Sequence, residues 1–492
     1  MKTDPRDLRI AELEHAVAMR DTAVATLQET VTILLARIED LESRLNRNSS
    51  NSSTPPSANP PGAPKTTSKK SSERKPGGQP GHKGTHRAVV DNPDRVVPHL
   101  PRACQHCQAD FSGNETMVGK PVRHQVTDLP PILPVVIEHQ LNRCRCENCG
   151  KTTRAELPVG VGQGQFGPRL TAFVAMLSGR YRLTRRELSS VLGDAFGLRL
   201  SVGSVQALCE QAAHALATPF QEVAEEVLAE PVVHPDETGW RHRGKKAWLW
   251  TVSSRKAAVF KLHRGRGHEA RRVILPDDYS GVVVSDRWAT YTPFERRGIC
   301  HAHLLRNWRA ISERKHPGAK AAGAWGVAET ERMLRLHREY RDGVLSRDGL
   351  RLRMRLVKAR YAKMLDMAEE CGDPKAKTLA LELNRLWKHL WTFVEMEGVD
   401  PTNNEAEQTI RPAVLWRKGS FGTWSEMGQR FTERSLTIAA TTRKQGVSLF
   451  DFLFQAIDAR LHQLPAPSIF SFNQVPNLAP RLYPALSLPL PT

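Results

Sequence analysis

The chain has 492 residues and a formal net charge of +19 at pH 7, and 40% of its residues are hydrophobic, so it can bury a sizeable core in two to four domains. A basic excess spread along most of the chain favours nucleic acid over a membrane as the partner, although a basic protein without such a partner would show it too. No apolar run approaches the roughly 18 residues of a membrane span, and Met1–Asp7 lacks the apolar core of a signal peptide, so we expect a cytoplasmic, nucleoid-associated protein.

Residues 1–47 are predicted to form a coiled coil. Apolar residues recur there in alternating steps of three and four over about five heptads. They are Ile10, Leu13, Val17, Val24, Leu27, Val31, Leu34, Ile38, Leu41 and Leu45. So narrow a stripe favours self-association into a homo-oligomer, whereas the alternative is one amphipathic helix packed on the protein's own core.

Residues 48–95 have a different composition and are predicted to be a basic, flexible linker. Asn, Ser, Pro, Gly and Lys dominate the stretch, and these residues cannot bury enough apolar area to fold alone. Lys83, within Gly77–Gly84, is a candidate DNA contact because lysines and backbone amides can follow phosphates. A solvated tether fits the composition equally well.

Residues 96–160 are predicted to form a zinc-binding ribbon. The chain has eight cysteines, and their clustering here favours a reduced compartment and a metal site over disulfides. Two Cys-x-x-Cys pairs supply the four thiolates of a closed tetrahedral structural zinc site. They are Cys104, Cys107, Cys146 and Cys149. The long spacer contains a predicted strand at 135–139, and Cys144 is an extra thiol that could compete with Cys146. Unliganded core cysteines are the alternative.

Residues 161–230 are predicted to be helical. Two helices, 182–192 and 202–216, are joined by a short turn, with Ser201 as the N-cap of the second. This pair could be a helix-turn-helix that reads DNA ends, with Arg199 as a contact. Ordinary helical packing beneath a sheet is an equally good interpretation, because a helix pair with a glycine turn is a weak signal.

An α/β arrangement with acidic residues at strand ends follows. A short apolar run from Val232 is predicted to end at Asp236. Two further strands, a helix-like run and a fourth strand come next, at 246–252, 257–262, 267–274 and 281–285. The fourth strand ends on Asp286. Either acid alone would be interpreted as a turn residue, but two carboxylates on one rigid sheet suit metal-dependent phosphoryl transfer. Glu237 should point to the opposite face, and Thr238 could orient Asp236.

Residues 300–399 are mostly helix-forming and are rich in Arg, Lys, Leu and Ala. His301 and His303 are two apart, so on a helix they point to different faces, and a positioning or DNA-contact role for His303 is preferred over a metal role. Tryptophans in this region are more often core residues than base-stacking groups; they are Trp308, Trp325, Trp387 and Trp391. Residues 461–492 contain recurrent prolines and are predicted to be a disordered tail.

Four motifs occur in a fixed order: His234-Pro-Asp-Glu-Thr238; Ser285-Asp286 followed by Tyr291; Cys300-His-Ala-His-Leu304; and Asn403-Asn-Glu-Ala-Glu407 with Ile410-Arg411-Pro412 and Arg417-Lys418. In order and spacing they resemble the insertion-sequence-66 family of bacterial DDE transposases. The resemblance implies a multidomain α+β protein whose ribonuclease-H-like α/β catalytic domain comprises 231–299 and 400–460, interrupted by a helical insertion at 300–399. It places the third acid at Glu407 and not at Glu405.

The resemblance implies DNA strand cleavage and transfer at transposon ends. Asp236, Asp286 and Glu407 would hold a pair of Mg²⁺ or Mn²⁺ ions, which prefer oxygen ligands. The remaining candidate DNA contacts of the catalytic region are His303, Arg306, Arg411, Arg417 and Lys418. The implied partners are the terminal inverted repeats, target DNA and accessory proteins of the same element.

Two other functions remain open from the residues alone. A non-catalytic zinc-ribbon DNA-binding regulator would account for the charge and the cysteines, but not for three acids placed on a sheet frame. A ribonuclease-H-like nuclease would cut DNA without joining it. Only the family resemblance separates this nuclease from a transposase.

Overall fold

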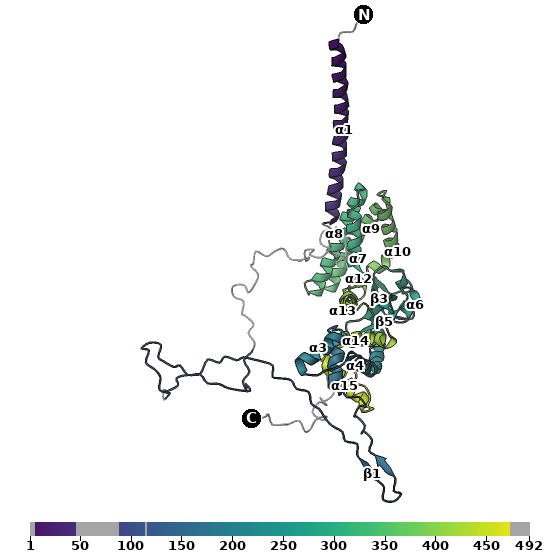
Figure 1. The fold of residues 1–492 in the computed structure, drawn as a ribbon. Helices are drawn as coiled ribbons and strands as arrows, with labels where there is room; N and C mark the ends of the chain where they lie inside the picture. Colours follow the sequence, from purple (N-terminus) through teal and green to yellow (C-terminus); the bar gives the residue numbers. More distant parts are fainter. Residues whose placement is uncertain (1–4, 46–87, 114–115, 473–492) are drawn as a thin grey trace. The chain divides into compact units, whose positions relative to one another are not determined.

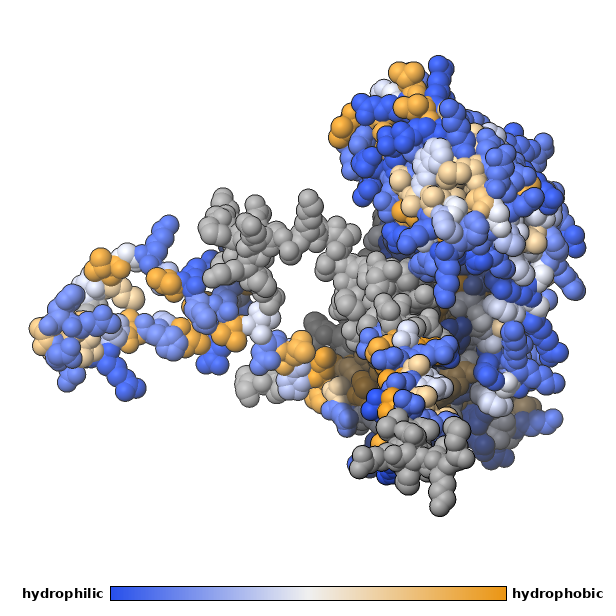
Figure 2. All heavy atoms as spheres, turned by 90° about the horizontal axis from the view of Figure 1, so that it is seen from above, coloured by the Kyte–Doolittle hydropathy of each residue, from blue (hydrophilic) through white to orange (hydrophobic). Residues whose placement is uncertain are grey.

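The computed structural model describes residues 5–45, 88–113 and 116–472 (Figure 1). The chain divides into two units, one formed by Thr66–Val135 and the other by Met1–Lys65 together with Val136–Thr492. Most of the predicted linker, including Lys83, lies outside the described residues. No helix in the described ranges is long and apolar enough to cross a membrane. Hydrophilic residues predominate on the face shown in Figure 2, in keeping with the charged composition.

The first element is one continuous helix, α1 (Pro5–Leu45). Side chains of the predicted heptad seam are exposed along it, among them Leu13, Leu27 and Leu34. A helix of this length with an uncovered apolar seam is what a coiled-coil partner would bury. The coiled coil itself stays a prediction.

Short β structure surrounds each cysteine pair. In the smaller unit, Ala103 and Asp110 form an antiparallel bridge. In the larger unit, β1 (Arg143–Arg145) pairs antiparallel with β2 (Thr152–Arg154). The strand predicted at 135–139 is wrong: these residues form no strand and are exposed, and a strand needs a partner to satisfy its backbone hydrogen bonds.

Four helices precede the main sheet: α2 (Pro168–Gly179), α3 (Arg185–Phe196), α4 (Val202–Ala215) and α5 (Ala217–Ala229). Local capping fixes the α3–α4 pair. Thr184 and Glu187 form a capping box at the start of α3, and Gly197 ends that helix with a φ of 66°. The predicted cap at Ser201 is confirmed, because its hydroxyl accepts the backbone N–H of Ser204.

The packing of α4 favours a structural role over DNA reading. Val205, Leu208 and Ala212 on one side of the helix are fully or almost fully buried, and the helix contacts α2, α14 and α15. It carries no lysine or arginine. Its exposed side includes Gln211 and His214 but no cationic side chain that would pair with phosphates, so the helix-turn-helix stays a prediction. Arg199 is exposed in the loop before it.

A five-stranded sheet forms the centre of the larger unit. Its strands are β3 (Val232–His242), β4 (Lys245–Ser253), β5 (Ala258–His263), β6 (Val282–Ser285) and β7 (Arg297–Ile299). The spatial order is β5-β4-β3-β6-β7, with β3, β4 and β5 antiparallel, and β6 and β7 parallel to β3. The helix α6 (His268–Arg272) and the 3₁₀ turn η2 (Ala289–Tyr291) connect the strands.

Two details of the sheet differ from the prediction. β3 does not end at Asp236 but continues to His242, because its polar second half pairs with β4 through a tight turn in which Arg243 and Gly244 have positive φ. The strand β7 was not predicted from the sequence, since it is three residues long and contains the charged Arg297. Arg297 is nevertheless buried.

The two faces of β6 belong to different hydrophobic cores. Val283 packs into one core with the helical layer of α2–α5, α14 (Glu426–Gln445) and α15 (Leu449–Leu461). Val282 and Val284 belong to the core of the predicted insertion. Alternate residues of a strand point to opposite faces, so one apolar run serves both cores.

The insertion is helical, as predicted. It comprises α7 (His301–Ser312), α8 (Pro317–Arg341), α9 (Arg347–Glu370), α10 (Pro374–Arg385), α11 (Trp387–Leu390) and α12 (Thr392–Glu395). Trp308 and Trp391 are buried in it, and Trp325 and Trp387 pack against the same core, which confirms their predicted role. Its two ends meet, because the His301 N–H donates to the Pro401 carbonyl (2.8 Å) and the Asn403 N–H to the Cys300 Sγ (3.2 Å).

The edge strand β5 is closed by side chains of α14. The backbone N–H groups of Ala258, Phe260 and Leu262 donate to Thr441, Thr437 and Glu433, at 3.2, 3.0 and 2.8 Å. Acceptors four residues apart on a helix rise about 6 Å, close to the spacing of alternate residues in a strand. The helix therefore satisfies donors that an edge strand would leave open.

The packed chain extends further than the sequence predicts. Beyond α15, Ile469 is buried, and Phe470 and Phe472 pack against the core. The predicted Pro-rich tail at 461–492 therefore has an ordered first part, up to at least residue 472. The remainder lies outside the described residues.

Candidate acidic site

Two of the predicted acids lie at the same end of neighbouring parallel strands. β3 pairs with β6 at Val232 and Val233, and Asp236 follows this paired segment within β3. Asp286 comes directly after β6. Because β3 and β6 run in parallel, both acids emerge at the same edge of the pair.

The third acid comes from α13 (Asn404–Ser420), with Glu407 in its first turn. Asn403 fixes the start of this helix on β3: its side-chain N–H donates to the Pro235 carbonyl (2.8 Å), and its Oδ1 lies 3.2 Å from the His234 Nδ1. Asn403 and His234 are both buried. These two positioning residues belong to the quoted motifs, but sequence reasoning gave them no role.

The charges of the three acids act on one another. Burial raises the pKa of Asp236 to about 8, helped by the negative charges of Glu237, Glu407 and Asp286. Burial also raises the pKa of Glu407; Asp286 adds to that rise, and Arg306 opposes it. Carboxylates crowded at a partly buried place repel one another, which favours either protonation or a bound cation.

The donor set fits a hard divalent cation. The Oε1 atom of Glu407 is buried without a hydrogen-bond partner. One oxygen of Asp236 and one of Asp286 accept only a neighbouring backbone N–H, from Glu237 and Trp288, both at 2.9 Å. Carboxylate oxygens with free lone pairs are the ligands that Mg²⁺ and Mn²⁺ prefer.

Glu405 is directed elsewhere. Its carboxylate is paired with the Lys444 ammonium and accepts the Ser253 hydroxyl (3.0 Å). Burial alone would raise the pKa of Glu405, but the hydrogen bonds from Lys444 and Ser253 lower it below its ordinary value. Glu405 thus has its charge balanced, whereas Glu407 does not.

Both oxygens of Glu237 also have partners, although burial still raises the pKa of Glu237. Nε and Nη2 of Arg266 both lie 2.8 Å from its Oε1, and the Tyr291 hydroxyl donates to its Oε2 (3.0 Å). The Arg266 guanidinium in turn lies over the rings of Trp248 and Trp288, at 4.7 and 4.4 Å. This set of contacts makes Glu237 a structural acid at the border of the site.

Two neighbours of the acids behave differently from the sequence expectation. The hydroxyl of Thr238, expected to orient Asp236, accepts a hydrogen bond from Arg417 instead (3.2 Å). Arg297, which the sequence did not single out, donates to the Asp286 carbonyl (2.7 Å). Burial lowers the pKa of Arg297 to about 10, against the opposing effect of Asp286.

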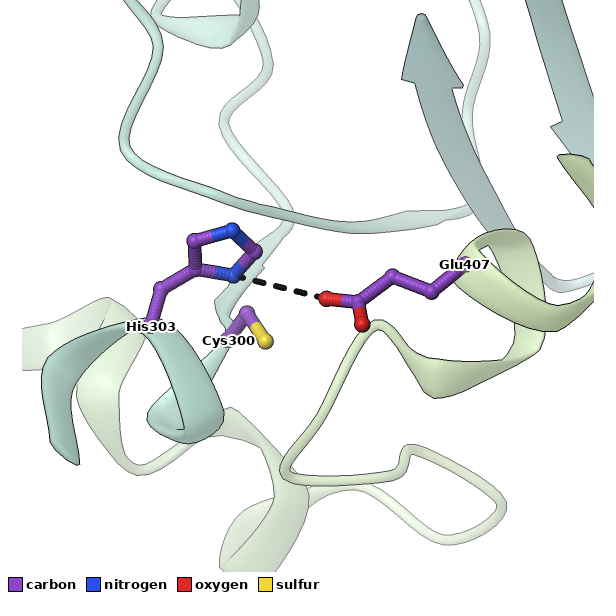
Figure 3. Close-up of side chains that lie close together, drawn as sticks. All are labelled: Cys300, His303 and Glu407. Carbon is purple, nitrogen blue, oxygen red and sulfur yellow. Dashed lines mark ion pairs between the residues drawn. The ribbon is translucent and has the colours of Figure 1, made fainter. Parts of the chain in front are cut away.

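His303 lies against the third acid (Figure 3). Its Nδ1 is 3.7 Å from the Glu407 Oε1. Burial and the charge of Arg306 lower the pKa of His303 to about 4, so the contact joins a neutral imidazole to the carboxyl. His301 points elsewhere, with its Nε2 2.8 Å from the Leu390 carbonyl. The two histidines therefore face different directions, as predicted.

The predicted basic contacts are placed unevenly. Arg411 and Lys418 are exposed and share the helix face of Glu407, four and eleven residues further along α13. Arg306 lies near Glu407. Arg417 is partly engaged in holding Gly239 and Thr238 of β3. Arg199 is on the loop before α4, in a different layer.

The two cysteine pairs have the same local geometry. The Cys104 N–H donates to the Ala109 carbonyl and the Gln108 N–H to the Cys104 carbonyl, both at 2.9 Å. The second turn repeats these bonds at Cys146, with Lys151 and Gly150, both at 2.8 Å. Gln108 and Gly150, the fifth residues, have φ of 61° and 67°.

These turns stabilise thiolates. Backbone N–H groups of the following turn, those of Cys107 and Cys149 first, lower the pKa of Cys104 and Cys146. A thiolate is the form that binds a metal. Cys144 lies outside the turns, on β1 opposite Thr153.

Comparisons with known proteins establish the family of this chain. Residues 163–430, more than half of the chain, match the Transposase IS66 family. The chain belongs to this family. In this IS66-family chain, residues 101–150 also match the zinc-finger binding domain of transposase IS66, and residues 2–88 match a family of unknown function. The family resemblance inferred from the motifs is thereby confirmed.

A relative from Sinorhizobium fredii, described as an uncharacterized protein y4qI, is 24% identical over 271 residues. The alignment covers 50% of this chain and 49% of the relative. The chain thus spans about half the length of the relative that it matches.

Proposed function

We propose that this protein is a DNA transposase that cuts and joins DNA strands at the ends of an insertion sequence, with Asp236, Asp286 and Glu407 as its catalytic acids. The observations that support the proposal are the placement of Asp236 and Asp286 at the same end of the parallel strands β3 and β6, the effect of the neighbouring acids on Asp236, whose pKa is raised to about 8, and the free buried oxygen of Glu407. Membership of the IS66 family supports DNA as the substrate.

The sheet supports a ribonuclease-H-like assignment. In this fold three antiparallel strands are extended on the side of the first strand by parallel strands, and the order β5-β4-β3-β6-β7 has that form. The acids then come from the first strand, from the end of the fourth strand and from a later helix. The long helical insertion lies between the second and third acids.

The acids are proposed to hold divalent metal ions, and Mg²⁺ bound there would activate a water or a DNA 3′-hydroxyl and stabilise the leaving oxygen. The chain's own residues position the oxygens. Asn403 fixes the start of α13 on β3, and Arg297 holds the backbone at Asp286. Arg411 and Lys418 place positive charge on the same helix face as Glu407, where they would bind the phosphates of a DNA strand.

The two cysteine turns are proposed to hold one structural zinc ion through Cys104, Cys107, Cys146 and Cys149. The match of 101–150 to a zinc-finger domain and the identical thiolate-stabilising turns support this assignment. Elemental analysis should find zinc in protein purified without chelator, and Cys144→Ser should leave that zinc in place. Loss of the zinc in Cys144→Ser with retention in Cys146→Ser would show that the ligand set is misassigned.

The deciding experiment incubates the full-length protein with linear DNA that carries the terminal repeats of its element, with and without Mg²⁺. Mg²⁺-dependent cuts at the repeat ends, followed by joining of the 3′ ends to a second DNA, are the expected result. Cutting without joining would identify a nuclease instead. Binding with no cutting under any divalent metal would favour the regulator.

A further inference from the structure

We propose that Cys300, His303 and Glu407 form a second transition-metal site, selective for Zn²⁺ over Mg²⁺, that shares Glu407 with the catalytic acids. The ligand atoms of these three residues lie within 4.8 Å of one another, and they point toward one another (Figure 3). The role of Glu407 as a catalytic acid rests on the proposed function, but metal binding at the three side chains does not depend on it.

The fold brings these residues together through two helix starts. Cys300 is the N-cap residue of α7, and His303 is three residues on, so both side chains lie on the same side of its first turn. Glu407 is in the first turn of α13. The Asn403 N–H, which donates to the Cys300 Sγ, joins the two helix starts.

The second observation is that both polar atoms lack partners. Nδ1 of His303 and Oε1 of Glu407 are buried, and neither has a hydrogen-bond partner. Their separation of 3.7 Å is too long for a hydrogen bond. Two ligands on one tetrahedral ion, each bonded at about 2.1 Å, lie roughly 3.4 Å apart, so a small adjustment would let one cation satisfy both atoms. Left without a partner, each buried polar atom is a cost to stability.

The donor chemistry selects the ion. One sulfur, one imidazole nitrogen and one carboxylate oxygen form a mixed set that suits Zn²⁺ and leaves the fourth tetrahedral position open. Mg²⁺ prefers oxygen ligands and would not take the sulfur. On binding, the Cys300 thiol loses its proton to solvent, and the thiolate pairs with the metal.

The site can be reached from solvent. Cys300 is fully buried, but the side chains of His303 and Glu407 are 32% and 37% exposed. An ion can therefore enter past these two side chains. Once bound, it would hold one oxygen of Glu407 and withdraw it from Mg²⁺ at the acids. Zn²⁺ in excess over the structural ion should thus inhibit Mg²⁺-dependent cleavage.

The test counts metal sites on the full-length protein by Co²⁺ titration. The sulfur-to-cobalt absorption in the near ultraviolet monitors the binding, and competition with Zn²⁺ then gives the affinity for zinc. The wild type should take up two equivalents, one with the strong absorption of four thiolates and one with the weaker absorption of a single thiolate. Cys300→Ser and His303→Ala should each weaken the second equivalent by at least about 100-fold, more than the loss of an outer-shell partner costs.

Matched variants separate the sites. Cys371→Ser removes a partly buried cysteine outside both sites and should leave both equivalents. Cys104→Ser should remove only the four-thiolate absorption. If Cys300→Ser does not fold, as judged by its circular dichroism and thermal melt, the partly exposed His303→Ala still decides the question.

Three results would overturn the proposal. They are a wild type that binds one equivalent only, a second equivalent that survives both Cys300→Ser and His303→Ala, and a second equivalent that is lost in Asp236→Asn but not in Cys300→Ser. The assay is separable from the proposed function. If the protein binds two equivalents of metal but does not cut DNA, the metal site is supported and the transposase proposal is refuted. If it cuts DNA but binds one equivalent, the transposase proposal is supported and the second metal site is refuted.

Discussion

The carboxylate of Asp236 lies among the negative charges of Glu237, Asp286 and Glu407, yet these neighbours are not equivalent. Glu237 is held by Arg266 and Tyr291, so both of its oxygens have hydrogen-bond partners. Glu407 has an oxygen without a partner. Glu237 therefore has no free oxygen to offer, whereas the free oxygen of Glu407 supports the proposal that Glu407 binds a metal ion.

The first prediction is that Asp236, Asp286 and Glu407 act as a unit. Asp236→Asn, Asp286→Asn and Glu407→Gln should each lower Mg²⁺-dependent cleavage by a similar factor, on the order of 10³-fold or more, and double variants should be little worse. DNA binding should persist, because the basic surface is unchanged. Cleavage rates and gel-shift affinities on the same DNA measure both quantities.

Glu405→Gln is the comparison for this prediction. It should retain cleavage and lose some thermal stability, since Lys444 would lose its charged partner. If Glu405→Gln abolishes cleavage and Glu407→Gln does not, the third acid is two residues away from its assigned position.

The second prediction concerns stability and pH without added Mg²⁺. The pKa of Asp236 is raised from 3.8 to about 8 by folding, so between these values the folded state binds the proton that the unfolded state has released. The free energy of unfolding should therefore fall as the pH rises through this window. Asp236→Asn should flatten the fall, which urea titrations from pH 5 to about 8 would measure.

Added Mg²⁺ should restore stability to the wild type at the upper end of this range and have little effect on Asp236→Asn. A wild-type stability that rises between pH 5 and 8 more steeply than that of the variant would contradict the assignment of a raised pKa.

At the scale of elements, side chains of one helix complete the backbone hydrogen bonding of another element. Thr437 of α14 accepts the buried N–H of Phe260 on the edge strand. Thr442, on the same helix and equally buried, instead donates its hydroxyl to the Ile438 carbonyl of its own helix. The two threonines look alike in the sequence, but only the Thr437 hydroxyl satisfies a buried backbone N–H of another element.

The third prediction follows from that difference. Thr437→Val should destabilise the protein by about 1–3 kcal/mol, because the Phe260 N–H would be left buried without an acceptor. Thr442→Val keeps the shape and removes only a bond within the helix, so its cost should be clearly smaller. Chemical denaturation of the two variants gives the comparison, and equal costs would show that α14 does not stabilise the edge strand in this way.

Local sequence predicted some of these elements and not others. Asp286 could be placed because an uninterrupted apolar strand precedes it. The second half of β3 could not be predicted from the sequence, because its polar residues are ordered by pairing with β4 and not by burial. The choice between Glu405 and Glu407 needed the family pattern, because the partner that neutralises Glu405 is Lys444, which is distant in sequence.

At the scale of the whole molecule, long-range contacts explain most of the remaining differences. Cys300, His303 and Glu407 come from two separate motifs, so no local pattern signals their contact. From the sequence Arg297 would be taken for a surface residue, but in the fold it is buried in β7. Ile469 belongs to a Pro-rich stretch but has an apolar core to cover. Each is decided by a neighbour that is distant along the chain.

The fourth prediction is that α1 makes the protein at least a dimer. Leu34→Asp places a charge in the apolar seam and should reduce the molar mass measured by light scattering of the full-length protein. Ile33→Asp is the matched control, since Ile33 is also exposed but lies outside the seam. Equal effects of the two changes, or a monomeric wild type at tens of micromolar, would rule out this role for α1.

The fifth prediction is that DNA binding depends strongly on salt. Each neutralised phosphate contributes about −0.9 to the slope of log K against log salt. Arg411→Gln and Lys418→Gln should each make that slope shallower by about one unit. Affinities measured across a salt series give the slope, and a flat response in the wild type would contradict a protein centred on DNA.

The meeting of the insertion's two ends has a consequence for how this domain can change. His301 is bonded to Pro401 and Cys300 to Asn403, so the chain leaves the sheet and returns to it at nearly the same point. The residues between these two points form an insertion, and lengthening it adds little loop-closure entropy while its two ends stay hydrogen-bonded to each other. The length of the insertion should therefore be variable at little entropic cost. A shorter or different insertion would have to keep the four residues at its base and the apolar residues that cover Val282 and Val284 of β6.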